Sequence, residues 1–196
     1  MRPVVLALIA GSAALPAAAQ DRPVFIPTRD VAVTYRIAGG DGQAQEMRMA
    51  WLVAGRKLRV DMPGGLGWSV LDQASQRMLV VLDQQRVTME LPTKDGPGGF
   101  SLPTEPPASA RFTRGGTATV AGLPCTIWSY ADGKSKGEAC LTADGVMLRS
   151  SGTQGSQGGS VEATAVAYGP QDPARFRAPE GYKAMLLPSG GKPPGR

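Results

Sequence analysis

The sequence of 196 residues contains no histidine and no asparagine. Histidine is the usual general base of a nucleophilic triad and the commonest neutral metal ligand, so its absence removes the standard arrangements for both chemistries. Residues 154–158 and 133–135 resemble parts of a nucleophile elbow and of a phosphate loop, but each lacks the leading glycine that its motif requires. We therefore expect neither a metal site nor a cofactor.

Carboxylates are the remaining candidates for catalysis, because a glycosidase needs only two of them on either side of a scissile bond. Asp61, Asp72 and Asp83 lie at the ends or on the polar faces of expected strands. Solvated residues of turns and sheet edges are typical of such positions. We therefore expect a protein that is not an enzyme.

Long apolar runs are also scarce. The one sustained run, residues 4–15, follows a positively charged start and is shorter than the roughly 20 residues of a membrane-spanning helix. Small residues then supply a signal-peptidase site between Ala19 and Gln20. No cysteine follows the run, so lipidation is not expected. The sequence thus predicts a signal peptide over residues 1–19 and a periplasmic or secreted product without a transmembrane segment.

Charge of either sign is never concentrated. Basic residues exceed acidic ones by 21 to 16, which gives a formal net charge of +5. These charges are scattered singly along strand-like segments, without the basic runs and interleaved aromatic residues that follow a nucleic-acid backbone. We therefore expect no nucleic-acid partner.

The chain has only two cysteines, Cys125 and Cys140, at equal distances from Asp132-Gly133, a pair typical of a two-residue hairpin turn. A hairpin folded about this turn would place the cysteines directly opposite each other. Neither has another cysteine to pair with, so the sequence predicts a structural disulfide between them. Catalytic cysteine pairs usually lie two residues apart at a helix start, which is not the arrangement here.

Alternation of apolar and polar residues with a period of two predicts β-strands. The expected strands of a first group are 30–37, 47–53, 56–62, 68–71, 78–82 and 87–91. Those of a second group are 125–130, 137–143, 146–151 and 161–168. No segment shows sustained helical spacing, although Asp172-Pro173 predicts one helical turn over residues 174–176. The predicted fold class is all-β, mainly antiparallel, with little helix.

Proline, glycine, serine and threonine dominate residues 92–116, where we expect a long exposed crossing between the two groups of strands. The second group alone is too small for a good core, so the sequence predicts one half-barrel domain over residues 20–184. The Pro/Gly-rich stretch 185–196 predicts a disordered tail.

Several short segments carry a resemblance to a known family. The segments are GRKLRVDMP at 55–63, RMLVVLD at 77–83, TMELP at 88–92, AGLPC at 121–125, and the closing Phe176, Pro179, Gly181 and Tyr182. In these the chain resembles an exported bacterial family of unknown function whose members are similar in fold to the LolA/LolB lipoprotein carriers. The resemblance implies an open, curved antiparallel sheet around an apolar concavity, and it implies no catalytic residues.

The apolar face of the expected sheet is the candidate site, because no amphipathic helix is available to cover it. Either the sheet closes on these side chains as a sealed core, or it stays open as a cleft for an apolar small molecule, a lipid or an acylated protein. A second class of function is a cell-envelope module that binds another protein through an open edge strand or a flat apolar face. The candidate ligand-binding residues are Met47, Met49, Trp51, Leu58, Val60, Met62, Trp68, Val80 and Leu82.

Overall fold

The computed structural model describes residues 22–38, 44–93, 110–131, 135–154 and 157–185. The predicted signal peptide with its cleavage site, the predicted two-residue turn between the cysteines and nearly all of the predicted tail lie outside these residues. Within them, no helix is long and apolar enough to cross a membrane.

Twelve strands in the described part of the chain form one sheet, in the order β12-β6-β5-β4-β3-β2-β1-β11-β10-β9-β8-β7. The strands of the first group are β1 Val31–Ala38, β2 Ala44–Leu52, β3 Lys57–Asp61, β4 Trp68–Asp72, β5 Arg77–Leu82 and β6 Val87–Pro92. Those that follow are β7 Arg111–Val120, β8 Leu123–Ala131, β9 Ser135–Leu141, β10 Met147–Gln154, β11 Gln157–Tyr168 and β12 Lys183–Met185. Only β12 pairs parallel, with β6. The predicted all-β, mainly antiparallel open sheet is confirmed.

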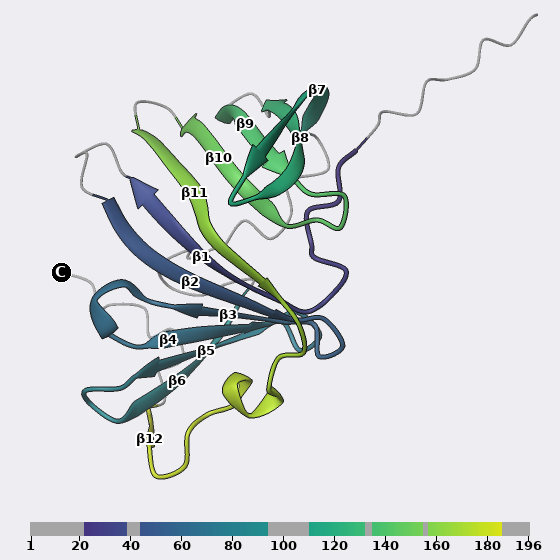
Figure 1. The fold of residues 1–196 in the computed structure, drawn as a ribbon. Helices are drawn as coiled ribbons and strands as arrows, with labels where there is room; N and C mark the ends of the chain where they lie inside the picture. Colours follow the sequence, from purple (N-terminus) through teal and green to yellow (C-terminus); the bar gives the residue numbers. More distant parts are fainter. Residues whose placement is uncertain (1–21, 39–43, 94–109, 132–134, 155–156, 186–196) are drawn as a thin grey trace, which may run out of the picture.

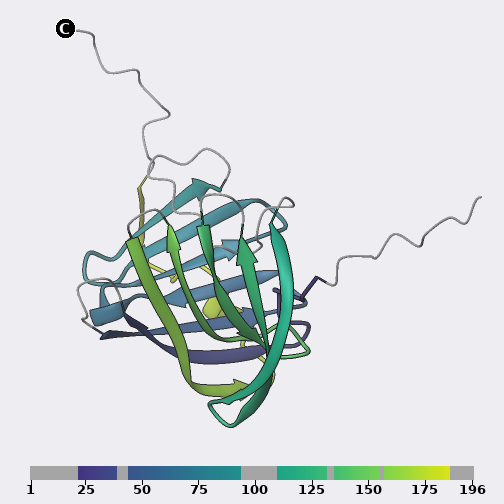
Figure 2. The ribbon, with the colours of Figure 1, turned by 90° about the horizontal axis from the view of Figure 1, so that it is seen from above.

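The sheet bends about its middle, where β1 pairs with β11 (Figure 1). Seen from above, β7–β11 cross in front of β1–β6 (Figure 2). We call the face enclosed by this bend, which carries Val31, Val33 and Tyr35 of β1, the inner face. The opposite face is the outer face.

The main core lies on the inner face between the two halves of the sheet. Val31, Val33 and Tyr35 are at most 2% exposed, and they cluster with Val146 and Leu148 from the second half. The Tyr35 hydroxyl donates a hydrogen bond to the Met147 carbonyl oxygen at 2.8 Å. Because its one polar group is paired, this large side chain is buried without an unsatisfied donor.

The outer face of β2–β5 is covered by the short 3₁₀ helix η2, Pro173–Phe176. Phe176, 2% exposed, packs there with Trp68, Val70 and Val81, and Figure 1 shows η2 on the side of β1–β6 that faces away from β7–β10. The Asp172 carboxylate caps η2 by accepting a hydrogen bond from the Ala174 amide at 2.9 Å. The helical turn predicted from Asp172-Pro173 is therefore confirmed, and it closes this face.

The outer face of β8–β10 is covered by the N-terminal segment. Phe25 packs beside Trp128 and Leu141, and its ring centroid lies 5.2 Å from that of Phe112. The 3₁₀ helix η2 and the N-terminal segment thus perform the covering role for which the sequence shows no amphipathic helix.

The crossing predicted for residues 92–116 is wrong at its C-terminal end, because β7 already begins at Arg111. Between Arg114 and Thr117 the pairing of β7 with β8 shifts register, and two glycines occupy this bulge. Glycine is tolerated there because β7 is an edge strand with a neighbour on one side only. The glycine pair marks a bulge and not the end of a loop. The predicted tail also begins too early, since Met185 is the last residue of β12.

The predicted disulfide between Cys125 and Cys140 is confirmed, with Cα atoms 5.4 Å apart. The predicted direct pairing of the two cysteines is wrong, because Cys140 lies opposite Ile127 and Cys125 is diagonal to it. Ala131 pairs with Lys136, which leaves four residues between the last paired positions and not two. This longer connection shifts the register by two residues. A shift of two leaves each side chain on the same face of the sheet, so both cysteines still point into the main core.

Candidate functional site

Directly paired residues of neighbouring strands point to the same face of a sheet, so the register identifies which side chains share the inner face. One row of paired residues runs across eight strands. We call it the first row: Met185, Met89, Val80, Ser69, Val60, Met49, Val33 and Val166, on β12, β6, β5, β4, β3, β2, β1 and β11. The second row, beside it, is Leu91, Met78, Leu71, Leu58, Trp51, Val31 and Tyr168.

The first row is most exposed at the edge of the sheet formed by β5, β6 and β12. Val33 is 2% exposed and Val60 is 6% exposed, whereas Val80 and Met89 are half-buried and Met185 is 51% exposed. The second row is buried at Leu58, Leu71 and Met78. Leu58 and Leu71 cluster with Val60 of the first row, and Met47, Met49 and Trp51 pack against this cluster. The sheet is thus neither fully sealed nor fully open, and an apolar strip becomes accessible over β5, β6 and β12.

Charged side chains are absent from the inner face of β3–β6. Their strands carry six charged residues, and alternation places every one on the outer face. There they form three ion pairs, Lys57 with Asp72, Arg59 with Asp61, and Arg77 with Glu90. The one polar side chain on the inner face of these four strands is Ser69, which is 4% exposed.

Of the nine predicted ligand-binding residues, seven lie on the inner face. They are Met47, Met49, Trp51, Leu58, Val60, Val80 and Leu82. Leu58 and Val60 are buried, and the other five are half-buried. Met62 follows β3, is half-buried, and its amide donates to the Gly67 carbonyl oxygen at 2.9 Å.

The prediction for Trp68 is wrong. Trp68 pairs with Asp61 and Val81 on the outer face, where it packs with Phe176 and where the Arg59 guanidinium carbon lies 3.9 Å from its ring centroid. The 3₁₀ helix η1, Pro63–Gly65, interrupts the chain between β3 and β4. An irregular segment resets the alternation, so the face of the next strand cannot be read from the previous one.

The predicted set lacks several inner-face residues, among them Val87, Met89 and Met185 near the edge of the sheet. The alternation of the predicted strand 87–91 already contained the first two, since Val87 pairs with Leu82 and Met89 with Val80. Met185 was placed in the predicted tail, and no local signal identifies a parallel strand of three residues.

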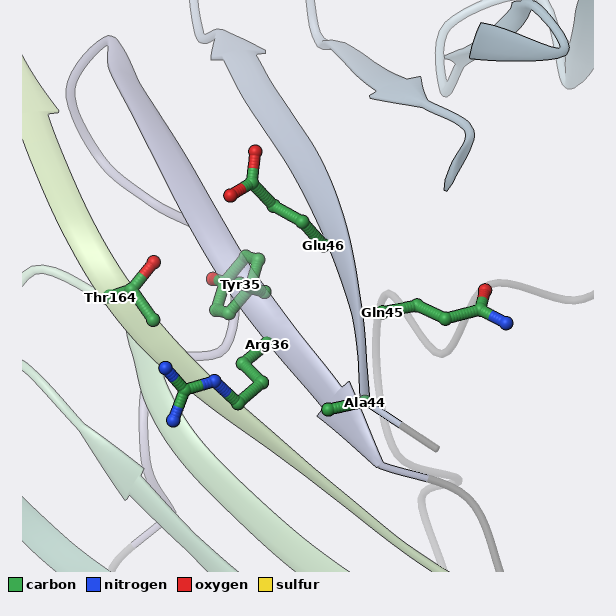
Figure 3. Close-up of a pocket in the computed structure, with 6 residues that line it drawn as sticks. All are labelled: Tyr35, Arg36, Ala44, Gln45, Glu46 and Thr164. Atoms are coloured by element: carbon green, nitrogen blue, oxygen red, sulfur yellow. The ribbon is translucent and has the colours of Figure 1, made fainter. Parts of the chain in front are cut away.

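A first hollow, of about 300 Å³, lies where β1 ends and β2 begins. In Figure 3 the Arg36 side chain points toward Thr164, whereas Gln45 points away from it. Burial raises the pKa of Tyr35 far above its ordinary value, so the phenol stays protonated and donates to Met147. Because the Tyr35 hydroxyl is already paired and the Arg36 and Gln45 side chains point in different directions, the polar groups of this hollow do not meet at one point as those of a catalytic site would.

A second hollow, of about 340 Å³, lies beside the disulfide and contains a polar network that joins three segments. The Asp144 carboxylate accepts hydrogen bonds from Arg29 Nε at 2.7 Å, Thr142 Oγ1 at 2.6 Å and the Tyr168 hydroxyl at 3.1 Å. Burial alone would raise the pKa of Asp144, but these hydrogen bonds outweigh it and hold the pKa below its ordinary value. An ionised, fully engaged carboxylate is a structural anchor and not a general base.

We expect Asp144→Asn to lower the free energy of unfolding at pH 7 by about 1–2 kcal/mol, because hydrogen bonds to a charged partner are replaced by neutral ones. A lowered native pKa contributes stability that is complete above the ordinary value of 3.8 and is lost as the pH falls through the native value. The difference between variant and wild type should therefore shrink below pH 3.8 in urea unfolding series. The exposed Glu180→Gln serves as control, and a difference that is constant down to pH 2 would contradict this role of Asp144.

Within the described residues, no group of three or more cysteine, aspartate or glutamate side chains could hold a metal ion.

Three comparisons place the chain among known proteins. The family that matches residues 41–167 is described as "Domain of unknown function (DUF4412)". A comparison with curated proteins gives no match.

Solved structures show similarity at low sequence identity. An uncharacterized conserved protein from Thermus thermophilus is 15% identical with a TM-score of 0.56, over 82% of this chain and 91% of that chain. The MucA/MucB complex of Pseudomonas aeruginosa contains a chain 14% identical with a TM-score of 0.49, over 86% of this chain and 63% of that one. A LolA superfamily protein from Nitrosomonas europaea is 8% identical with a TM-score of 0.37, over 79% and 92%. The likeness to the Thermus thermophilus protein is one of fold alone.

Proposed function

The chain belongs to the DUF4412 family, whose description assigns no activity, and we propose from its inner face that it is an exported, non-enzymatic protein that binds a lipid or another apolar ligand. The observation that carries this proposal is the first row. Its apolar side chains continue from the sealed core at Val33 to the half-buried Met89 and the exposed Met185, with no charge on the inner face of β3–β6.

The chemistry of the strip suits an acyl chain. Each methylene group that a ligand buries contributes about 0.8 kcal/mol. Methionine is unbranched and has three rotatable bonds, so Met89 and Met185 can adapt to a flexible chain. The neighbouring second row is buried at Leu58, Leu71 and Met78 and is therefore already packed before a ligand binds, which limits the entropy lost on binding.

Two features support export. The disulfide between Cys125 and Cys140 is typical of an oxidising compartment. The signal peptide predicted over residues 1–19 is the second feature. The disulfide joins two cysteines of the same chain, so it needs no cysteine from another protein.

The alternative is a protein partner at an edge of the sheet. β7 is the long edge strand, and most of its side chains are exposed. Unpaired backbone groups on such a strand can accept a strand from another chain. Its bulge opposes this use, because a bulge bends the edge away from a regular ladder. We therefore favour the inner face.

The binding proposal is tested with Met89→Asp. We expect it to weaken the binding of a fluorescent fatty-acid analogue at least about tenfold, because a carboxylate in the apolar strip loses solvation when the acyl chain covers it. Saturable enhancement of probe fluorescence measures the affinity, and far-UV circular dichroism verifies the fold.

Val24→Asp is the matched control. Val24 is an exposed apolar residue, 47% accessible, in the N-terminal segment that lies over the other half of the molecule. The same change of charge and shape at this position should leave probe affinity within about twofold. Equal weakening by both variants, or no saturable binding by the folded wild type, would contradict the proposal and favour the edge strand β7.

A further inference from the structure

The parallel strand β12 adds one charged group to the inner face. In its register, Lys183 lies beside Val87 and Met185 beside Met89, both of which are inner-face residues. Alternation turns Tyr182 to the outer side, where it packs against the cluster that contains Phe176. Among the described residues of β2–β6 and β12, Lys183 is therefore the one charged side chain on the inner face.

The backbone at Lys183 is fixed to the connection between β5 and β6. The Lys183 amide donates to the Arg86 carbonyl oxygen at 2.9 Å, and the Tyr182 hydroxyl donates to Asp83 Oδ1 at 3.0 Å. The Arg86 guanidinium carbon lies 5.8 Å from the Tyr182 ring centroid. Asp83 and Arg86 are thus engaged with Tyr182, and Lys183 forms no ion pair with any described residue.

This arrangement places a single cation at the open end of the apolar strip. We propose that the ligand of the inner face is a long-chain amphiphile with an anionic headgroup, whose chain lies along the first row and whose headgroup meets the Lys183 ammonium. The proposal rests on the proposed function and narrows its ligand class. Charge complementarity carries it, because the same face of β2–β6 and β12 offers no acidic side chain that would attract a cationic headgroup.

The dimensions and the side-chain chemistry are consistent. Where the strip is accessible, from β12 to β5, the first row crosses three strands, a span of about 10 Å at about 4.8 Å between neighbours. A lysine can lay its apolar stem along such a strip while its ammonium stays at the water boundary. The ammonium is a compact point charge, so it selects for the sign of the headgroup and not for its shape.

The test compares three amphiphiles that share a dodecyl chain, dodecanoate, dodecyl maltoside and dodecyltrimethylammonium, each below its micelle concentration. Isothermal titration calorimetry at low ionic strength should rank their affinities in that order for the wild type. Lys183→Glu should weaken dodecanoate binding about two- to fivefold and strengthen trimethylammonium binding similarly, the range of an exposed ion pair. In about 1 M salt the preference should disappear, because the screening length contracts to about 3 Å.

Two further variants separate the local charge from other effects. Lys183→Met keeps the apolar stem and should abolish the preference for anionic headgroups without loss of maltoside affinity. Lys136→Glu, at an exposed position of β9, changes the net charge equally and should leave the ranking unchanged.

If the three amphiphiles bind equally to the wild type, or if Lys136→Glu changes their affinities as much as Lys183→Glu does, the headgroup inference is overturned while the proposed function stands. If dodecyl maltoside and dodecanoate both fail to bind, the proposed function fails and this inference with it.

Discussion

Phe176→Ala should lower the free energy of unfolding by about 3–5 kcal/mol, the cost of removing a fully buried aromatic side chain. Phe176 is the one residue of η2 that is buried, and it closes the outer face over Trp68, Val70 and Val81. For a domain of this size the loss corresponds to a fall in melting temperature of roughly 6–20 °C. Thermal unfolding followed by circular dichroism measures it, and the emission of Trp68 should shift to the red as water reaches its ring.

Leu66→Ala is the control for this substitution, because Leu66 is also a large apolar residue but is 58% exposed. Surface substitutions of this kind usually change stability by less than about 0.5 kcal/mol. A Phe176→Ala variant as stable as Leu66→Ala would show that η2 does not close the outer face.

Replacement of Cys125 and Cys140 together by serine should cost about 3 kcal/mol, since the bridge closes a loop with a sequence separation of 15. Both side chains lie in the main core, so two hydroxyl groups left there add to this loss. The fold should persist, and the affinity for the fatty-acid analogue should not change, because the bridge joins β8 to β9 and the first row crosses neither strand. Urea unfolding and probe titration measure the two effects separately.

Thiol counting provides the check on the disulfide itself. Protein isolated from an oxidising compartment without reductant should show no reactive thiol after denaturation. Two free thiols, or a double variant whose stability equals that of the wild type, would contradict the structural role of the bridge.

Strands that alternate strictly are readable from the sequence. Val31, Val33 and Tyr35 of β1 are buried, as their period of two predicts. The turn at Asp172-Pro173 is equally readable, because an aspartate followed by proline is typical of the start of a helical turn. Where the local signal is ambiguous the prediction fails, as at the glycine pair in β7, which is a bulge and was predicted as a loop.

The candidate site is only partly readable, because it depends on register across strands and not on alternation within one. The alternation of β3, continued along the chain, would place Trp68 on the inner face. Because η1 interrupts this alternation before β4, Trp68 lies on the outer face. Lys183 and Met185 join the inner face only through pairing with β6, almost a hundred residues earlier in the chain. Single-sequence patterns contain no signal for such distant pairing.

The pairing of β1 with β11 determines the order in which this protein can fold. β2–β6 and β7–β10 are meanders in which each strand pairs with its sequence neighbour, so each can form early by closing short loops. Val31 meets Tyr168 only across 137 positions of chain, a closure that costs much more entropy. We therefore expect two hairpin arrays to form independently and the central seam to close last, in the slow, millisecond-to-second range of β-proteins. Until then the still unjoined edges of β1 and β11 are the part of the chain most exposed to aggregation.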